Sequence, residues 1–294
     1  MATRFALIIE PTASDDTRSD FTSTLTQVDA SAPALSVGEL STQRGDGIFE
    51  SIGVVDAHPQ EVTAHLERFV RSAEICDLPV PNVEQWRQAI AAAAALCGPG
   101  EWVVKTILSR GVEHGPTPTA WVTAADAPDF SRPRREGVSV VTLDRGFSLD
   151  TPARAPWLLL GAKTLSYAVN MASLREAHKR GADDAIFVSS DGFVLEAPTA
   201  SVILRFGDVF VTPEPTGGIL HGTTQLSAFS WLEEHGFATE YRDVGVVELG
   251  AADAAWLVSS LRLAAPIRRI DEMAVPVDQE LSDELNAYLL SPRD

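Results

Sequence analysis

The sequence predicts an α+β protein made of two domains. Apolar patterns that suit strands and helices follow one another irregularly through the 294 residues, without the regular alternation of a parallel α/β sheet. This length exceeds the size at which one hydrophobic core usually stops growing, and 45% of the residues are hydrophobic. Residues 125–137 are polar and interrupted by proline, which is typical of a linker. We therefore expect a small domain at residues 1–124 and a larger one at residues 138–294.

The first half combines two helices with several strands. Helices are predicted at residues 62–76 and 83–96, because apolar side chains recur there at helical spacing. A glycine-rich turn at residues 44–47 leads directly into one of the strands. The strands expected in this half lie near residues 5–10, 48–52, 102–109 and 120–123.

The second half contains three expected helices. The first, at residues 164–180, ends before Gly181, since glycine commonly follows the C-terminus of a helix. The others begin near Thr223 and after Pro276. An aspartate-glycine pair at residues 191–192 suits a tight turn and predicts a hairpin of two short strands. The strands expected here lie at residues 138–143, 185–190, 193–196, 201–206, 209–212, 244–249 and 254–259.

The charge of the chain limits the ligands that it can attract. Asp and Glu number 41 against 23 Lys and Arg, which gives a formal net charge of −18. Such a field repels nucleic acids and anionic membranes, so a phosphate or carboxylate must be bound by a local cluster of donors. No apolar segment is long enough for a membrane helix, and the two cysteines show no metal-ligand spacing. We expect a cytoplasmic protein without nucleic-acid, membrane or metal partners.

The sequence offers little for hydrolases or metalloenzymes. The six histidines show neither metal-ligand spacing nor the neighbours of a catalytic triad. Ser189-Ser190 lacks the glycines of a nucleophile elbow, and the glycine-rich loop at residues 217–222 lacks the lysine of a nucleotide-binding P-loop.

Lys163 has surroundings that suit a reactive amine. It lies in Leu160-Gly161-Ala162-Lys163-Thr164, an apolar setting that would lower the pKa of the amine. It also precedes an expected helix, where a cation opposes the helix dipole. Such an amine can form a Schiff base with an aldehyde such as pyridoxal phosphate. Taken alone, the position also fits a surface lysine, which is the commoner case.

Two further segments supply groups that this cofactor requires. Glu196, at the end of a short hairpin strand, provides a carboxylate that could keep a pyridine nitrogen protonated. The loop at residues 217–222 enters a helix, so Gly222 and Thr223 could present N–H groups to a phosphate while Thr223 or Thr224 adds a hydroxyl. Each segment also has an ordinary explanation, an exposed strand glutamate and a threonine helix cap. Only their combination favours a cofactor site.

An anion pocket in so acidic a chain should contain arginine. Arg68 lies on the first expected helix beside its apolar stripe and is a candidate for the cofactor phosphate. Arg110, in Ser109-Arg110-Gly111, better suits a substrate carboxylate. A plain surface arginine is the alternative for both residues.

The order and spacing of these pieces resemble the fold-type IV pyridoxal-phosphate enzymes, a family of branched-chain and D-amino-acid aminotransferases and 4-amino-4-deoxychorismate lyase. The resemblance runs from about Arg44 to Pro266. Six motifs in the family's order are far more specific than any one of them. The motifs are Gly45-Asp46-Gly47-Ile48-Phe49-Glu50, His65-Leu66-Glu67-Arg68, Ser109-Arg110-Gly111, Lys163-Thr164-Leu165-Ser166-Tyr167-Ala168-Val169-Asn170, Gly192-Phe193-Val194-Leu195-Glu196 and Gly218-Ile219-Leu220-His221-Gly222-Thr223-Thr224.

The resemblance implies a two-domain fold similar to D-amino-acid aminotransferase, a homodimer, and a role for each candidate residue. Lys163 is then the Schiff-base lysine, carried by the larger domain, and Glu196 is the partner of the pyridine nitrogen. Tyr167 falls where such enzymes place a tyrosine near the phenolic oxygen of the cofactor. The remaining roles follow the same pattern: Arg68, Gly222, Thr223 and Thr224 at the phosphate, and Arg110 and Phe49 at a small amino substrate.

Two segments resemble the lyases more than the aminotransferases. Val258-Ser259-Ser260-Leu261-Arg262 is similar to a lyase segment, and Ser260 could add a phosphate contact. Ser51 matches a lyase threonine that helps to protonate the departing pyruvate, and serine keeps the hydroxyl. The expected activity is therefore release of pyruvate and formation of 4-aminobenzoate for folate synthesis. An amino-acid aminotransferase is the alternative, and a catalytically inactive pyridoxal-phosphate-binding homologue is a third.

The sequence departs from the family pattern at four positions. His221 replaces a common proline, Gln225 a common arginine, Ser259 a common asparagine, and Leu263 a common glycine. These changes leave the cofactor residues in place and concern the substrate.

Overall fold

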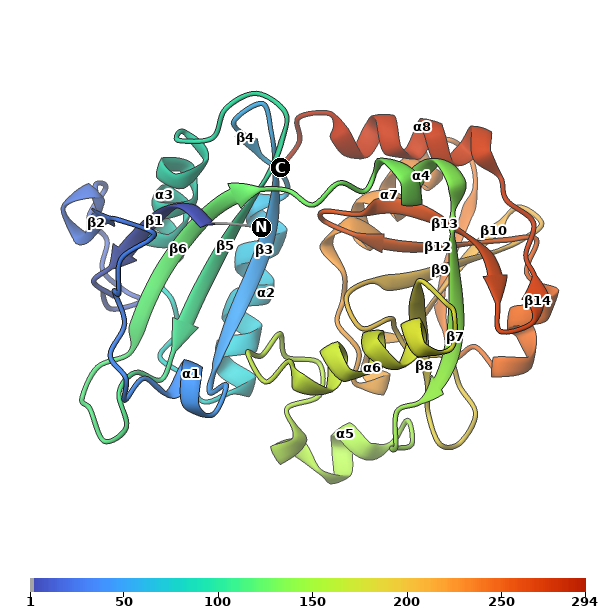
Figure 1. Cartoon of the computed structure of the whole chain (residues 1–294), viewed down its shortest axis with the longest axis horizontal. Helices are drawn as coiled ribbons and strands as arrows, with labels where there is room; N and C mark the ends of the chain where they lie inside the picture. Colours follow the sequence, from blue (N-terminus) through green and yellow to red (C-terminus); the bar gives the residue numbers. More distant parts are fainter. Residues whose placement is uncertain (1–2) are drawn as a thin grey trace. The chain divides into compact units, whose positions relative to one another are not determined.

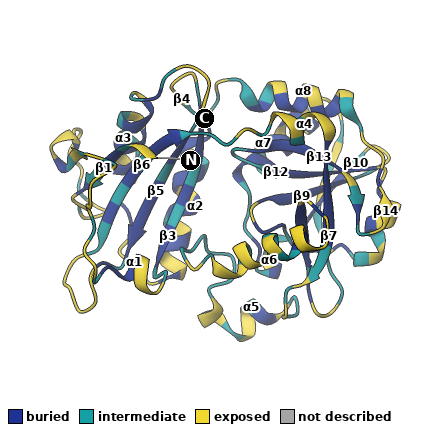
Figure 2. Ribbon diagram, in the orientation of Figure 1, coloured by how far each residue is buried: buried dark blue, intermediate teal, exposed yellow. Residues whose placement is uncertain are grey.

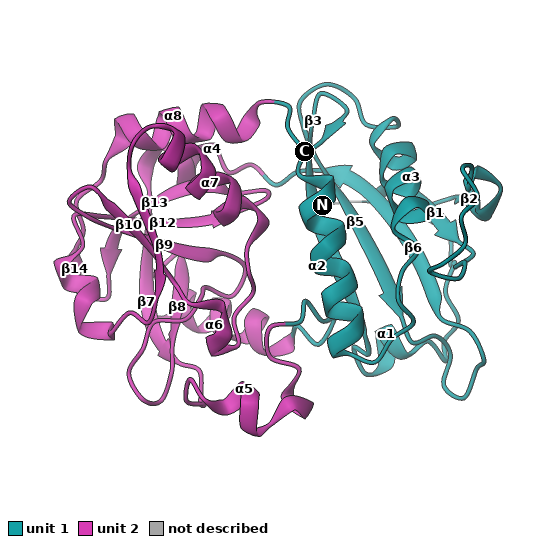
Figure 3. Ribbon diagram, turned by 180° about the vertical axis from the view of Figure 1, so that it is seen from behind, with its two compact units in different colours: residues 1–128, 162–167, 292–294 teal, residues 129–161, 168–291 magenta. Residues whose placement is uncertain are grey.

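The computed structural model describes residues 3–294, which form two compact units (Figures 1 and 3). Unit 1 contains the described residues up to Pro128 together with Ala162–Tyr167 and Pro292–Asp294. Unit 2 contains Asp129–Gly161 and Ala168–Ser291. Within the described part of the chain, no helix is both long and apolar enough to span a membrane.

Unit 1 is built on a six-stranded sheet with the order β2-β1-β6-β5-β3-β4, in which every neighbouring pair is antiparallel. The strands are β1 (Thr3–Ile9), β2 (Leu25–Val28), β3 (Gly47–Val55), β4 (His58–Pro59), β5 (Glu101–Ser109) and β6 (Thr119–Asp126). Short helical turns occupy η1 (Thr22–Thr24) and α1 (Leu40–Gln43).

Two helices, α2 (Val62–Ile75) and α3 (Val83–Ala94), cover one face of this sheet, and Figure 3 shows them in front of the strands. Because side chains alternate along a strand, β3 sends Ile48, Ile52 and Val54 toward the helices, where they are fully buried. Phe49 and Ser51 point to the opposite face and are only partly buried. The core of unit 1 therefore lies between the sheet and the helices.

The segment Ala162–Tyr167 pairs with the edge of β3, which corrects the expectation that the larger domain carries Lys163. The backbone N–H of Phe49 donates to the Lys163 carbonyl at 3.0 Å, and the N–H of Leu165 donates to the Gly47 carbonyl at 2.8 Å. Since these bonds hold the backbone extended, the helix expected from residue 164 begins only at Ala168.

The expected linker also differs from the structure. The strand β6 ends at Asp126, and Ser131–Glu136 forms a helix, α4. Arg134 on this helix donates to the carbonyl oxygens of Leu261 and Arg262, which ties the segment to unit 2. Residues 129–137 are therefore part of the second unit.

Unit 2 contains an eight-stranded mixed sheet with the order β11-β10-β9-β12-β13-β7-β8, and β14 pairs with β13. The strands are β7 (Val138–Asp144), β8 (Asp184–Val188), β9 (Ser201–Phe206), β10 (Val209–Pro213), β11 (Ala238–Arg242), β12 (Ala254–Ser259), β13 (Leu263–Ile270) and β14 (Met273–Ala274). The helical elements are α4, α5 (Thr151–Arg154), η2 (Pro156–Leu158), α6 (Ala168–Lys179), η3 (Pro215–Gly217), α7 (Thr223–Glu234), η4 (Val246–Ala251) and α8 (Gln279–Leu290).

Helices α7 and α8 pack on one face of this sheet. Phe229 and Leu232 of α7 and Leu285 of α8 share a buried cluster with Trp256 of β12. A second cluster of valine, leucine, isoleucine and alanine lies in the same unit and includes Val202 and Leu257. Figure 2 shows the resulting pattern of buried strands and partly exposed helices.

In unit 2 the predicted end of α6 is confirmed, and two predicted strands are wrong. Gly181 adopts φ +75° immediately after the last turn of α6, as its C-terminal position predicts. Residues 193–196 form isolated bridges with Val188 and Gly245 instead of a regular strand. Residues 244–249, expected as a strand, lead into the helical turn η4.

Candidate functional site

In unit 1, Lys163 lies with two aromatic residues on the sheet face that α2 and α3 do not cover. Its Nζ is 4.6 Å from the centre of the Phe49 ring, and that ring meets the ring of Tyr167 edge-on at 5.5 Å. The backbone N–H of Lys163 donates to Ser72 Oγ at 3.1 Å. The structure thus brings Lys163, Phe49 and Tyr167 together, and Ser51 follows on the same face of β3.

Arg68 faces the other side of β3, where it forms a buried ion pair with Glu50. Arg68 Nε donates to Glu50 Oε1 at 2.8 Å and Nη2 donates to Oε2 at 2.7 Å. His65 Nδ1 lies 2.7 Å from the same Oε2. Burial alone would raise the pKa of Glu50, but the charge and hydrogen bonds of Arg68 and the contact with His65 outweigh it and hold the pKa far below its usual range.

Replacement of Glu50 by glutamine should destabilise unit 1 strongly. The variant leaves the Arg68 guanidinium buried without its counter-charge, which typically costs about 3–5 kcal/mol of unfolding free energy. Urea unfolding followed by circular dichroism measures this loss, and Glu67→Gln on the exposed side of α2 should change little.

The same variant has a defined pH dependence. Because the folded-state pKa of Glu50 is lowered, its stabilising contribution is present above the ordinary carboxyl pKa and declines as the pH falls below about 4.5. The difference in stability between wild type and Glu50→Gln should therefore shrink on acidification. An unchanged difference down to strongly acidic pH would contradict the ion-pair interpretation.

Arg110, the candidate for a substrate carboxylate, is largely engaged within unit 1. Its Nε donates to Asp46 Oδ2 at 2.8 Å, and Nη1 and Nη2 donate to the carbonyls of Asp77 and Cys76 at 2.9 and 2.7 Å. The hydrogen bond and charge of Asp46 raise the pKa of Arg110 despite partial burial. In this structure Arg110 anchors the end of α2 to the loop after β5.

In unit 2, Glu196 lies beside the loop that leads into α7. The backbone N–H of Leu220 donates to Glu196 Oε2 at 3.1 Å, which fixes the carboxylate orientation. Burial lowers the pKa of Arg145, and the negative charge of Glu196 counteracts part of that effect. The sequence analysis does not predict a role for Arg145, and the only local signal for it is its position two residues after the predicted strand 138–143. Its guanidinium also stacks over Phe187, with 4.6 Å to the ring centre.

Hydroxyl groups gather at the start of α7. Ser260 Oγ lies 3.5 Å from Thr223 Oγ1 and 3.4 Å from Thr224 Oγ1. The helix has Gly222 as its N-cap, without a capping side chain, and a Cβ at Gly222 would collide with Ser201 Oγ. Three hydroxyls beside the N-terminal N–H groups of a 12-residue helix suit a phosphate. The structure thus brings together Gly222, Thr223, Thr224 and Ser260, as the sequence predicts.

The turn that carries Ser260 is fixed from beneath by a buried ion pair. Arg262 Nη2 donates to Asp184 Oδ2 at 2.6 Å. The Arg262 guanidinium also lies over the ring of Phe130, 5.6 Å from its centre. Leu263 adopts φ +60°, a left-handed conformation that favours glycine, the residue expected at this position from the resemblance. The departure at Leu263 therefore keeps the turn and adds local backbone strain.

Two further departures, His221 and Gln225, meet at Tyr241 on β11. Gln225 Nε2 donates to the Tyr241 hydroxyl at 3.0 Å, and His221 Nε2 lies 3.5 Å from the same oxygen. Burial raises the pKa of Tyr241, and the hydrogen bond from Gln225 partly offsets this. Gln225 thus braces the first turn of α7 against the neighbouring strand.

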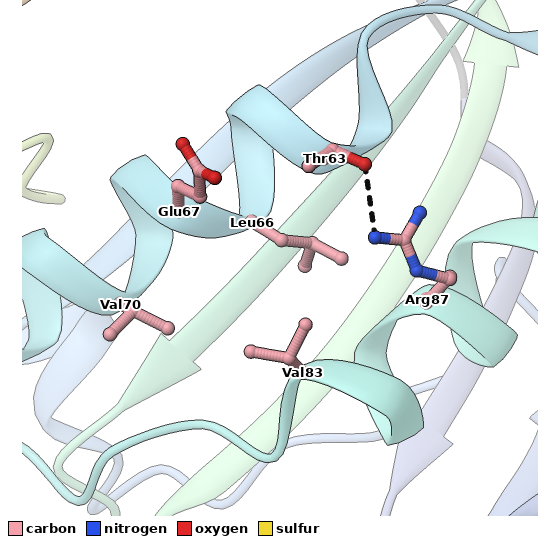
Figure 4. Close-up of a pocket in the computed structure, with 6 residues that line it drawn as sticks. All are labelled: Thr63, Leu66, Glu67, Val70, Val83 and Arg87. Carbon is pink, nitrogen blue, oxygen red and sulfur yellow. Dashed lines mark hydrogen bonds between the residues drawn. The ribbon is translucent and has the colours of Figure 1, made fainter. Parts of the chain in front are cut away.

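A separate hollow of about 330 Å³ lies between α2 and α3 on unit 1 (Figure 4). Its lining is Thr63, Leu66, Glu67, Val70, Val83 and Arg87, and Arg87 Nη2 donates to Thr63 Oγ1 at 3.1 Å. None of the predicted site residues lines this hollow, so we do not assign it to the active site.

Comparison with known proteins gives consistent matches over most of the chain. Residues 47–270 match the family described as amino-transferase class IV. A bifunctional aminodeoxychorismate lyase and D-amino acid transaminase of Mycobacterium tuberculosis is 40% identical over 280 residues, covering 89% of this chain and 95% of the relative.

Solved structures agree with this match. A fold IV-transaminase from Curtobacterium pusillum is 46% identical, with a TM-score of 0.93 and 97% of each chain covered. The pyridoxal-phosphate-bound form of a hypothetical aminotransferase from Mycobacterium tuberculosis is 38% identical, with a TM-score of 0.87 and coverage of 98% and 100%.

Proposed function

This chain belongs to the amino-transferase class IV family, whose fold-type IV enzymes depend on pyridoxal phosphate, and on that basis we propose that it is a 4-amino-4-deoxychorismate lyase. The proposed reaction releases pyruvate and forms 4-aminobenzoate for folate synthesis. Support comes from the hydroxyl of Ser51, which lies on the same face of β3 as Phe49 and Lys163 Nζ.

Each unit carries residues that we propose for the cofactor. Lys163 is the proposed site of covalent attachment, and Glu196, oriented by the Leu220 N–H, is the proposed partner of the pyridine nitrogen. Thr223, Thr224, Ser260 and the N–H groups at Gly222 are assigned to the phosphate, with Tyr167 near the phenolic oxygen. When bound, pyridoxal phosphate supplies an electron-poor ring that stabilises negative charge on the substrate carbon bearing the amine.

Arg68 stays proposed as a residue for the phosphate. Two of its nitrogens, Nε and Nη2, already donate to Glu50. Arg110 and Phe49 stay assigned to the substrate, Arg110 through the order it imposes on the loop around Asp46.

The proton transfers are assigned to two side chains. Lys163 Nζ takes the proton from the ring carbon that bears the amine, and the adjacent carbon–oxygen bond to the enolpyruvyl group breaks. The Ser51 hydroxyl then donates a proton to the methylene carbon of the departing group, which leaves as pyruvate, and the ring becomes aromatic. Solvent restores the proton on Ser51 and accepts the one held by Lys163.

Replacement of Ser51 by alanine should lower the lyase kcat by about 10²-fold, because a positioned proton donor contributes roughly this factor. Ser51→Thr should keep most of the activity, since it preserves the hydroxyl. Pyruvate release in a coupled assay measures both variants. A Ser51→Ala enzyme with wild-type kcat would remove Ser51 from the mechanism.

Transamination of amino acids, including D-amino acids, is a second candidate for the same site. It is favoured by the 46% identical transaminase and by the relative named for both activities. In that reaction Lys163 Nζ moves a proton from the substrate α-carbon and needs no acid at Ser51.

A single preparation distinguishes the two reactions. Purified enzyme incubated with 4-amino-4-deoxychorismate and no keto acid should release pyruvate and 4-aminobenzoate in equal amounts. Conversion that requires a keto acid, with no 4-aminobenzoate formed, would instead establish the aminotransferase. We also propose a cytoplasmic homodimer, which sedimentation velocity tests by mass.

A further inference from the structure

Three polar side chains form a row across the sheet of unit 1. Ser51 on β3 lies directly opposite Lys105 on β5, and Lys105 lies directly opposite Thr123 on β6. Opposed residues of antiparallel strands point to the same face with Cβ atoms about 5 Å apart. The row Ser51–Lys105–Thr123 therefore presents a hydroxyl, an ammonium and a second hydroxyl side by side.

This row lies on the sheet face that carries Phe49 and Lys163 Nζ. The adjacent residues Glu50 and Thr106 point to the helix side and are 1% exposed, whereas all three members of the row are partly exposed. Ser51 is two residues from Phe49, a separation of about 7 Å along the strand. The row is thus next to the amine assigned to the cofactor.

The three side chains make no hydrogen bond or ion pair with other residues in the described part of the chain, residues 3–294. This is unusual for Lys105, because the protein has 41 acids and only three lysines. Lys179 has Glu176 at 3.9 Å, and many of the arginines have a carboxylate within 4 Å. A partly buried ammonium that lies between two hydroxyls and has no carboxylate within 4 Å in the described residues is suited to an external anion.

We propose that Lys105, flanked by Ser51 and Thr123, binds a carboxylate of the substrate, and specifically the carboxylate of the pyruvyl portion. The identity of that portion rests on the proposed function. In an enolpyruvyl group the methylene carbon and the carboxylate are attached to one carbon. The proton donor for the methylene carbon and the cation for the carboxylate must therefore be neighbours, as Ser51 and Lys105 are.

The two arginines considered above are engaged by other groups. Arg110 is bound to Asp46 and to two carbonyls, and Arg68 is bound to Glu50 on the opposite face of the sheet. Lys105 is the remaining cation that β3 and β5 place beside Ser51. It would set specificity for substrates that carry a carboxylate next to the reacting carbon.

Binding of pyruvate by the cofactor-loaded enzyme tests the proposal without turnover, and broadening of the pyruvate methyl resonance reports it. Lys105→Met keeps the aliphatic stem and should weaken pyruvate binding about tenfold to a hundredfold, the usual effect of losing a charged hydrogen bond. Lys105→Arg should restore part of the affinity. Acetone, which lacks the carboxylate, should bind wild type and Lys105→Met equally.

The matched control is Lys179→Met on the exposed side of α6, which should bind pyruvate as wild type does. Equal pyruvate affinity in wild type and Lys105→Met would overturn the proposal, as would wild type binding acetone as tightly as pyruvate. Failure of the lyase assay, with pyruvate binding still dependent on Lys105, would refute the lyase reaction and leave the carboxylate site standing. Pyruvate is also the keto acid of alanine, so the probe remains valid for a transaminase.

Discussion

Replacement of Lys163 by alanine should abolish covalent attachment of pyridoxal phosphate and lower kcat by about 10³-fold or more. The variant loses both the amine that bonds to the cofactor and the base that moves the substrate proton, so two contributions disappear together. The position of Nζ over Phe49, beside Tyr167, gives it a defined place on the sheet face of unit 1.

Borohydride reduction followed by peptide mapping measures the attachment. In wild type the modified peptide should contain Lys163, and in Lys163→Ala no modified peptide should be found. Lys179→Ala provides a control that removes another lysine and should leave both labelling and activity unchanged. Cofactor fixed to a lysine in Lys163→Ala would contradict the assignment.

Replacement of Glu196 by glutamine should lower kcat by about 10²-fold while leaving the cofactor attached. A neutral amide can still accept from the Leu220 N–H, so the loop should hold its geometry, but it no longer favours a protonated pyridine nitrogen. A lower kcat with a normal yield of borohydride-fixed cofactor is the expected signature.

Glu196→Gln also tests the link to Arg145. The variant removes the negative charge that favours the protonated guanidinium, so unit 2 should be somewhat less stable in urea. Glu240→Gln on the exposed edge strand β11 is the matched control and should preserve both activity and stability. Wild-type kcat in Glu196→Gln would separate this carboxylate from the cofactor.

The sequence can indicate the parts of the candidate site whose signals are local. The glycine-rich loop and the threonines at the start of α7 form a recognisable pattern within eight residues, 217–224. The structure places Ser260 beside these threonines. The roles of Lys163 and Glu196 stay predictions, made from motifs whose chemistry is explicit. The fold class is confirmed by the family match and by the transaminase structure.

The parts that the sequence could not supply depend on pairing between distant segments. Nothing local indicates that Lys163 pairs with β3, because an edge strand accepts any extended backbone regardless of its side chains. The Lys105 row arises from the register of three strands, which single-sequence patterns do not fix. The interaction of Arg145 with Glu196 could not be predicted, because the two residues lie 51 positions apart in the sequence.

The division of unit 1 among separate segments has a consequence for synthesis. The open edge of β3 stays uncovered until Ala162–Tyr167 has left the ribosome, which happens only after the whole of Asp129–Gly161, the first segment of unit 2. Residues 293 and 294 attach to the start of α2 in the same unit. There the Thr63 N–H donates to Asp294 Oδ1 at 2.8 Å, and Arg293 pairs with Glu61 at 3.0 Å. A nascent chain halted near residue 128 would therefore expose a strand edge able to pair with other chains.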